Sequence, residues 1–208
     1  MYQELFKKYL DDLASSKPAP GGGSASALVA AAGLSLISMP ASLTVGKEKY
    51  RAVEDEVKNI LSSCEQLRQR VAVLIDKDIL AYAKVAKAYA LAKDTEKNRQ
   101  TRSQAIQQAL KEALIVPLEI CKLSYQGIKL CPPIAEKGNP NLISDVGVAV
   151  LFLEAAYQGA LLNVQINLKY IKDQQVVVKI CGILEPMERE IPPIKQQVIT
   201  KVKTALSK

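Results

Sequence analysis

The segment from Lys47 to Leu91 carries apolar residues at intervals of three, four and seven positions. Such spacing puts side chains on one face of an α-helix, in which a turn takes about 3.6 residues. The stripe consists of Val57, Leu61, Cys64, Val71, Ile75, Ile79, Tyr82, Ala86 and Tyr89. Charged and amide side chains fall on the opposite side. The pattern predicts an amphipathic helix, or two consecutive helices, with a total length of roughly 60 Å.

Five other segments favour helix by composition, and none has the alternation typical of strands. They are Gln3 to Ser15, Ser24 to Thr44, Glu96 to Leu130, Asn141 to Lys172 and Pro193 to Ser207. Glycine-rich and proline-rich stretches predict the breaks between them. These breaks are Lys17 to Gly23, Ala92 to Thr95, Cys131 to Pro140, and Glu185-Pro186 with Pro192-Pro193 beyond it. Short connections between long helices favour an up-and-down bundle, so residues 1–208 are predicted to form a single all-α domain.

The segment from Ser24 to Thr44 is apolar on nearly all sides. A helix of this kind must be covered all round, and we expect a homodimer that completes its cover. The run from Ala25 to Val45 approaches membrane-spanning length, but it is rich in small residues and contains Pro40. We interpret it as a buried helix and expect no membrane association. The alternative is a membrane-associated protein, and insolubility of the expressed chain without detergent would favour it.

Size, charge and cysteine pattern narrow the class of protein. The chain has 208 residues, of which 49% are apolar and 24% charged, as expected for one globular domain. A net charge of +7 favours an anionic ligand, although a solvated basic surface explains it equally well. Aromatic content of 5% and dispersed lysines argue against nucleic acid. Four cysteines without a CxxC pair predict buried free thiols, and the start of the chain is unlike a signal peptide, so we expect a cytoplasmic protein.

The chain contains no histidine. This excludes Ser-His-Asp and Cys-His catalysis and the usual zinc and haem sites. No phosphate-binding loop of the Walker type and no dinucleotide fingerprint occurs either. Acid–base chemistry in this protein must therefore use Asp, Glu, Lys, Tyr or bound water.

Two candidate constellations flank the apolar helix. Gly21, Gly22, Gly23 and Ser24 precede it, and their bare amides with the positive helix end could hold a carboxylate or a polar ring edge. A flexible hinge with Ser24 as the N-cap is the alternative. Lys47 and Tyr50 follow the helix one turn apart, where Lys47 could bind an anion, donate a proton if burial lowers its pKa, or simply sit in water.

Asp78 is the carboxylate best placed for chemistry in the long amphipathic helix. Asp76 and Asp78 point about 200° apart in a helix, so they cannot serve one site together. Asp78 lies at the edge of the apolar stripe, where a raised pKa and acid–base work become plausible. An exposed Asp78 paired with nearby lysines is the alternative.

A polar cluster follows the proline-rich break. Asn139, Asn141, Ser144 and Asp145 lie close together in the sequence. Either Asn139 before Pro140, or Asn141 with Ser144 three residues later, is a ready N-cap, so helix capping alone could account for this cluster. Asn163 and Asn167 lie one turn apart on the next helix, among apolar residues. If buried, these two amides must be hydrogen-bonded, and they could hold a bend, a dimer contact or a ligand.

These blocks resemble the formiminotetrahydrofolate cyclodeaminase and methenyltetrahydrofolate cyclohydrolase family, with order and spacing that fit from about Leu5 to Lys172. The segments that carry the resemblance are PAPGGGSASALVAAAG, LTVGKEKY, LIDKDILAYAKVAKAYALAKDT, ALKEALIVPLEI and KGNPNLISDVGVAVLFLEAAYQGALLNVQINLKYIKD. The sequence departs from the family pattern at Ser42, where asparagine is usual, and at Pro40.

The resemblance implies a helical homodimer that acts on tetrahydrofolate carrying a one-carbon group, without a metal or prosthetic group. It carries over the Gly21 to Ser24 loop, Lys47, Asp78, Asn139, Asn141 and Asp145. We hypothesise that Asp78 is the acid–base group, that Asp145 binds the N–H edge of the pterin, and that Lys47 contacts an anion or the transition state. Tyr50, Ser144 and Asn163 complete the candidate folate site.

The resemblance leaves two reactions open. In a cyclodeaminase, N10 attacks the N5-formimino carbon and ammonia leaves; in a cyclohydrolase, water opens the methenyl bridge. The chain has no room for the formiminotransferase of the bifunctional members, so we expect the module to act alone. A non-catalytic helical scaffold is the chief rival interpretation.

Overall fold

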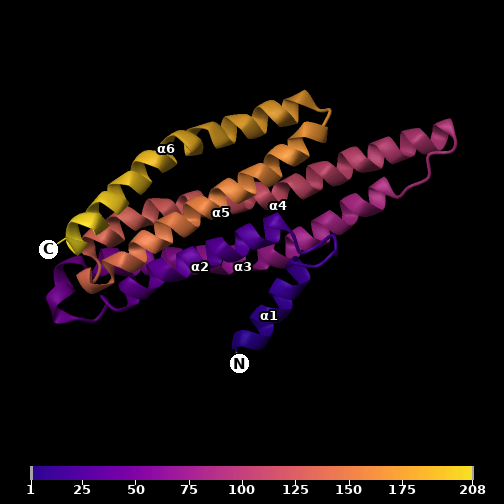
Figure 1. The fold of residues 1–208 in the computed structure, drawn as a ribbon. Helices are drawn as coiled ribbons and strands as arrows, with labels where there is room; N and C mark the ends of the chain where they lie inside the picture. Colours follow the sequence, from indigo (N-terminus) through magenta and orange to yellow (C-terminus); the bar gives the residue numbers. More distant parts are fainter. Residues whose placement is uncertain (1, 208) are drawn as a thin grey trace.

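The computed structural model describes residues 2–207, and this part of the chain forms helices joined by turns, without a strand (Figure 1). The all-α prediction is confirmed. The elements are α1 (Tyr2–Leu13), α2 (Gly22–Ser42), the short 3-10 helix η1 (Glu48–Val53), α3 (Glu54–Tyr89), α4 (Glu96–Lys137), the 3-10 turn η2 (Pro140–Leu142), α5 (Ile143–Tyr170) and α6 (Gln174–Leu206).

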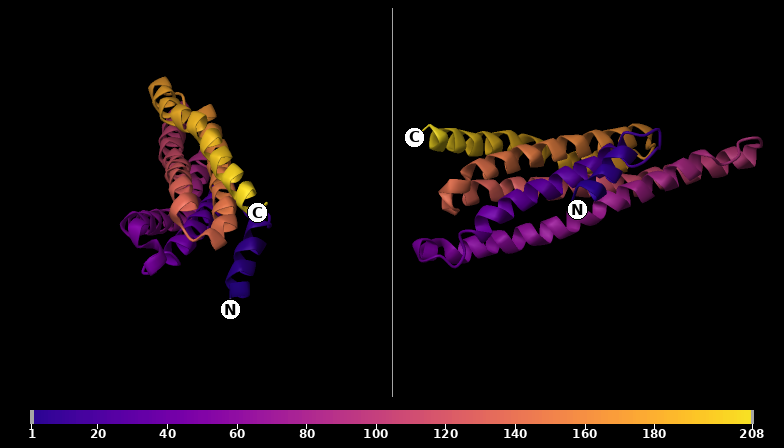
Figure 2. Two further views of the ribbon diagram at one scale, coloured as in Figure 1. Left: turned by 90° about the vertical axis from the view of Figure 1, so that its left-hand side faces the viewer. Right: turned by 60° about the horizontal axis from the view of Figure 1, so that its bottom comes forward.

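Four long helices enclose the core. α2 packs against both α3 and α5, and α4 packs against the same two helices from the other side, while α6 covers α4 and α5 (Figures 1 and 2). Leu34, Leu123 and Leu153 are fully buried where these helices meet. Gly127 permits the close approach, since a Cβ there would lie 2.8 Å from a methyl carbon of Leu34. The first half of the apolar stripe predicted along α3, from Val57 to Val71, packs against α2 and α4.

The break predicted at Cys131 to Pro140 exists only at its end, at Gly138 and Asn139, and the break predicted at Glu185 to Pro193 is wrong, because the prolines do not interrupt the helices. α4 continues through Pro132 and Pro133 to Lys137, and α6 contains three prolines. An internal proline removes one helical hydrogen bond and costs about 3 kcal/mol or more. Buried side chains on both sides of the prolines, among them Cys131 and Ile134 in α4, offset this cost. α6 bends along its length instead of ending (Figure 1).

α2 and α5 expose much of their apolar surface. Each has an apolar stretch with the length and hydropathy of a membrane span, but only 56% and 50% of these stretches is buried within the protein. We call the uncovered side the α2–α5 face; its large exposed side chains are Met39, Leu43, Val148, Leu151, Phe152, Leu162 and Ile166. On α5 these residues recur at helical spacing, so they form one continuous stripe.

α1 stands away from the body of the protein (Figures 1 and 2). Its apolar side chains Leu5, Phe6 and Leu10 are exposed. An isolated helix of this length is marginal in water, because helix nucleation is unfavourable. Among the residues that the structure describes, nothing covers this apolar face of α1.

The cysteines follow the sequence expectation only in part. Cys64, Cys121 and Cys131 are buried free thiols, whereas Cys181 is exposed on α6. The prediction that all the thiols are buried is wrong for Cys181, because aliphatic neighbours in the sequence of a helix do not all share its face. Burial raises the pKa of the Cys64 thiol to about 12, which makes it unreactive.

Candidate active site

A cavity of about 810 Å³ opens between the start of α2, the second half of α3, the middle of α4 and the end of α5. Its lining comprises Pro18, Ala19, Gly21, Gly22, Gly23, Asp78, Ala81, Tyr82, Val85, Ala86, Tyr89, Leu110, Ala113, Pro117, Asn163, Ile166, Asn167 and Tyr170. A mostly apolar wall with a few polar groups and a volume in this range is typical of a small-molecule site.

Asp78 joins the middle of α3 to the start of α2. Its Oδ2 accepts a hydrogen bond of 2.9 Å from the backbone N–H of Ser24. The first N–H groups of a helix have no partner within the helix and carry partial positive charge, so the carboxylate stabilises this end of α2. The hydroxyl of Tyr9 shares a hydrogen bond of 3.0 Å with Ser24 Oγ, which connects α1 to the same point.

Gly23 is required for this close approach. A Cβ on Gly23 would lie 2.6 Å from Cγ of Asp78, which is an overlap. α2 begins at Gly22 with Gly21 in the N-cap position, and no side chain caps it from that position. The alternative that Ser24 serves as the N-cap is therefore wrong, because the carboxylate of α3 performs that task from outside the segment.

Burial raises the pKa of the Asp78 carboxyl, and the hydrogen bond from Ser24 opposes this shift without cancelling it. Asp76, two residues earlier, is exposed, as predicted from the helix geometry. A carboxyl in an apolar cavity with an elevated pKa is a candidate acid–base group.

Asn163 and Asn167 form the polar part of the wall on α5. Each Nδ2 donates a hydrogen bond of 2.8 Å to a backbone carbonyl one turn earlier, from Asn163 to Gly159 and from Asn167 to Asn163. The expectation that these amides are hydrogen-bonded is confirmed. Each amide oxygen can accept a hydrogen bond from a ligand, and each Nδ2 keeps a second N–H to donate.

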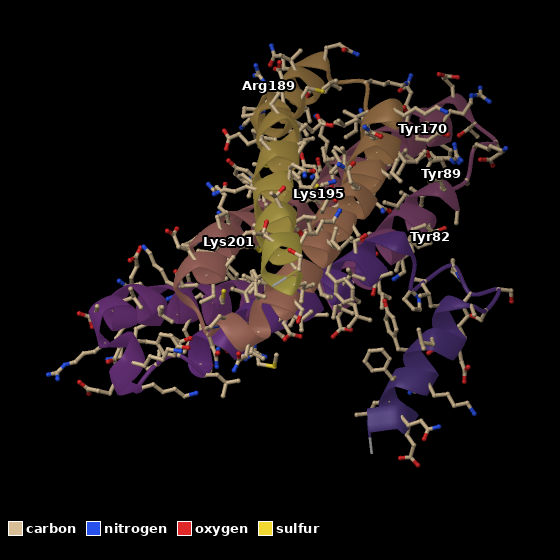
Figure 3. The ribbon with its side chains drawn as sticks, turned by 60° about the vertical axis from the view of Figure 1, so that its left-hand side comes forward. Tyr82, Tyr89, Tyr170, Arg189, Lys195 and Lys201 are labelled. Atoms are coloured by element: carbon tan, nitrogen blue, oxygen red, sulfur yellow. The ribbon has the colours of Figure 1, made fainter. Side chains whose placement is uncertain are left out.

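Three tyrosines line the outer part of the cavity. Tyr82 and Tyr89 project from α3, and Tyr170 lies at the end of α5 (Figure 3). The helical period predicted Tyr82 and Tyr89 as part of the packed stripe, but they are 47% and 43% exposed. Sequence reasoning did not select Tyr170 or Pro117. Their only signal was a position on the same faces as Asn163 and Ala113.

The remaining predicted residues lie at the other end of α2. The Tyr50 hydroxyl donates to Asn139 Oδ1 at 3.5 Å, and the Asn139 N–H donates to Thr44 Oγ1 at 2.8 Å. Asn139 Oδ1 also accepts from the Asn141 N–H at 3.1 Å, so its predicted capping role is confirmed. Lys47, Asn141 and Ser144 are exposed, and Asp145 is half-buried. Tyr50 also lines a second concavity of about 930 Å³.

The predicted site residues therefore form two groups within one chain. The cavity collects Gly21, Gly22, Gly23, Ser24, Asp78 and Asn163, whereas Lys47, Tyr50, Asn139, Asn141, Ser144 and Asp145 lie beyond the far end of α2. The 21 residues of α2 separate the groups by roughly 30 Å. Within residues 2–207 of one chain, these residues do not share a single cleft. Among residues 2–207, no three His, Cys, Asp or Glu side chains cluster as metal ligands.

The fold and the cavity define an all-helical protein with a partly buried carboxylate of raised pKa beside a glycine-rich helix start. The chain belongs to the formiminotransferase-cyclodeaminase family, whose model matches residues 5–182. It is 40% identical over 204 residues to a methenyltetrahydrofolate cyclohydrolase from Methylorubrum extorquens, covering 98% of each chain. It is 32% identical over 167 residues to a formimidoyltransferase-cyclodeaminase from Rattus norvegicus and spans 31% of that longer protein.

A solved structure has the same fold. It is the formiminotetrahydrofolate cyclodeaminase from Thermotoga maritima, with a TM-score of 0.86 and 34% sequence identity over 96% of each chain. The resemblance stated from the sequence is thereby confirmed.

Proposed function

We propose that this protein is an enzyme of one-carbon folate metabolism that acts on the carbon bridging N5 and N10 of tetrahydrofolate. The observation that carries the proposal is the Asp78 carboxyl, which has a raised pKa and is held by Ser24 N–H on the wall of a cavity of folate size. The family relationship supplies the substrate class.

Asp78 is the group that moves protons. Hydrolysis of the methenyl bridge and cyclodeamination both pass through one tetrahedral carbon between N5 and N10. Each reaction needs a proton removed from the nucleophile and a proton delivered to the leaving nitrogen. A carboxyl of raised pKa serves both steps in turn. The amide oxygens of Asn163 and Asn167 accept from the pterin, and Tyr82 packs against the aromatic middle of the substrate.

Hydrolysis of 5,10-methenyltetrahydrofolate to 10-formyltetrahydrofolate is the first candidate reaction. It is supported by 40% identity to a cyclohydrolase that this chain matches from end to end. Cyclodeamination of 5-formiminotetrahydrofolate is the second, supported by the Thermotoga maritima enzyme at 34% identity.

The two reactions change the methenyl absorbance in opposite directions. Purified protein is mixed with 5,10-methenyltetrahydrofolate and, separately, with 5-formiminotetrahydrofolate. We expect an enzyme-dependent loss of absorbance in the first mixture. A gain in the second mixture alone would identify a cyclodeaminase. No change in either mixture, with ligand binding still present, would favour the non-catalytic scaffold.

We further propose that the enzyme is a homodimer of up-and-down bundles joined through the α2–α5 face. That face is apolar and continuous on α5, and a second copy is the partner that covers it symmetrically. A two-fold axis perpendicular to α2 makes the two copies antiparallel. The Asp78 cavity of one copy then meets the Lys47 and Asp145 end of the other, which restores the predicted site across the subunit boundary.

In this arrangement Lys47 contacts an anionic part of the substrate or the transition state, and Asp145 binds the pterin edge. Exposed Leu5, Phe6 and Leu10 give α1 an apolar face that extends the contact area. We propose a cytoplasmic location, which fits the free thiols.

Placing a charge on the α2–α5 face is expected to separate the subunits. Phe152→Glu puts a carboxylate at the centre of the proposed interface, where it would be desolvated without a partner. We expect a monomer by analytical ultracentrifugation, with helical content unchanged by circular dichroism and activity lost. Val178→Glu is the matched control, since Val178 is 70% exposed on α6, outside this face. A dimeric Phe152→Glu protein, or a monomeric wild type, would contradict the proposal.

A further inference from the structure

A single hydrogen bond connects α1 to the start of α2, beside the Asp78 cavity. The hydroxyl of Tyr9 and Ser24 Oγ lie 3.0 Å apart. Among residues 2–207, no other hydrogen bond or ion pair joins α1 to another helix. Tyr9 is half-buried, whereas Leu5 and Phe6 on the same side of α1 are exposed. The Tyr9 hydroxyl is therefore the polar contact that fixes α1 against α2.

Ser24 has a fully buried hydroxyl that its own helix does not satisfy. Later serines of α2 donate to the backbone carbonyl four residues earlier; Ser26 Oγ, for example, donates to the carbonyl of Gly22 at 2.7 Å. Ser24 is only the third residue of α2, so the residue four positions earlier, Pro20, precedes the helix. A buried hydroxyl without a partner is unfavourable. Tyr9 supplies the partner that the helix provides to the later serines.

The backbone of Ser24 holds the carboxylate of the candidate active site. Its N–H donates to Asp78 Oδ2 at 2.9 Å, and within residues 2–207 the Asp78 side chain has no other hydrogen bond. Tyr9, Ser24 and Asp78 thus form a chain of contacts from α1 through α2 to α3. A shift of Ser24 turns its N–H, and the carboxylate that accepts from this N–H must follow.

We propose that Tyr9 is a positioning residue of this enzyme, whose hydroxyl fixes Ser24 and thereby the direction of the Asp78 carboxylate. The inference rests on the proposed function, because it takes Asp78 to be the acid–base group. Tyr9 does not line the cavity, so it acts on the reaction only through Ser24. Loss of its hydroxyl should lower kcat and leave KM nearly unchanged, since the groups of the cavity wall that bind the substrate stay in place.

Tyr9→Phe is the first test, because it removes the hydroxyl and keeps the ring. We expect kcat in the methenyl absorbance assay to fall about 10-fold, the usual effect of one hydrogen bond, and KM to change by about 2-fold or less. Tyr125→Phe is the matched control. Its hydroxyl bonds Glu190 between α4 and α6, away from the cavity, so its turnover should equal that of the wild type. Circular dichroism and thermal unfolding check the fold of both variants.

The pH profile distinguishes positioning from a loss of folded protein. Burial raises the pKa of the Asp78 carboxyl, and the hydrogen bond from Ser24 opposes this rise. Weakening that bond raises the pKa further, so kcat/KM of Tyr9→Phe should begin to fall at a higher pH than that of the wild type as the solution is acidified. A smaller folded fraction would scale the whole profile without moving it. The other titratable groups in the cavity wall of residues 2–207 are phenols, those of Tyr82, Tyr89 and Tyr170.

A double-variant cycle tests whether the Tyr9 hydroxyl acts through Ser24. In Ser24→Ala no buried hydroxyl needs a partner, so the addition of Tyr9→Phe should change kcat by less than about 2-fold.

A fall in kcat with a displaced pH profile, absent from the Tyr125→Phe control and from the Ser24→Ala background, supports the assignment. Wild-type kcat with an unmoved profile in Tyr9→Phe, or an equal loss in the Ser24→Ala background, would overturn it, while wild-type turnover left the proposed function intact. Absence of wild-type turnover with both folate substrates would overturn the proposed function and this role of Tyr9 together.

Discussion

Replacement of Asp78 by asparagine is expected to lower kcat/KM by about 10²- to 10⁴-fold, the usual contribution of a positioned acid–base group. Asparagine has the same shape, and its Oδ1 can still accept from the Ser24 N–H, so the start of α2 stays capped. What is lost is the ability to exchange a proton. Initial rates with 5,10-methenyltetrahydrofolate measure the effect, and circular dichroism checks the fold.

The same variant should not lose stability at neutral pH. Burial raises the pKa of native Asp78 above its value in the unfolded chain. Between these two pKa values, the native state therefore binds more protons than the unfolded state. The free energy of unfolding of the wild type falls as pH rises through this window. Asparagine has no such titration. Chemical denaturation should give the variant a free energy of unfolding at pH 7 equal to or above that of the wild type.

Wild-type kcat/KM should also fall as pH drops through the raised pKa of Asp78, because the base form is lost. Asp76→Asn is the control, since Asp76 is exposed on the same helix. If Asp78→Asn kept near-native turnover, and its kcat/KM still fell at low pH as in the wild type, Asp78 would not be the acid–base group.

Replacement of Gly23 by alanine is expected to reduce kcat/KM by about 100-fold, the effect of moving a catalytic group by about 1 Å. The new Cβ would overlap the Asp78 carboxyl, which must turn away from the Ser24 N–H. Alanine favours helix over glycine by about 1 kcal/mol, which helps the variant to remain folded. The measurement is the same absorbance assay, combined with thermal unfolding.

Gly21→Ala provides the matched control for this overlap. A Cβ on Gly21 meets nothing within 4 Å, and its backbone at φ −134° is extended. We expect near-native activity from it. If Gly23→Ala kept activity within about threefold of the wild type, the contact between Asp78 and α2 would not matter for catalysis. In the Gly23→Ala/Asp78→Asn double variant the two losses should not add, since both act through one carboxyl.

The helical spacing of apolar residues predicted most of α3, but it did not predict what the second half of this helix contacts. Val57, Cys64 and Val71 are buried, as the stripe requires. Tyr82 and Tyr89 continue the same stripe yet border a cavity. Helical spacing of apolar residues predicts an apolar face, but it does not predict whether protein or a ligand covers that face. The amide pair Asn163 and Asn167 was the better sequence signal, since polar groups on an apolar face need partners.

Two features lay outside the reach of local sequence patterns. Pro132 and Pro133 predict a helix break from the local sequence. The helix continues through them because α4 packs against its neighbours along its whole length. The separation of the Lys47 and Asp145 group from Asp78 depends on the direction of α2. Motif order along a chain gives no information about which ends of the helices meet, within one subunit or between two.

Pro117 leaves a backbone acceptor in the wall of the cavity. Proline has no N–H, so the carbonyl of Ala113, four residues earlier in α4, lacks its usual helical donor. Both residues line the cavity beside Asp78. We therefore expect this carbonyl to accept a hydrogen bond from an N–H of the proposed substrate, and only a change at Pro117 itself would restore its helical donor.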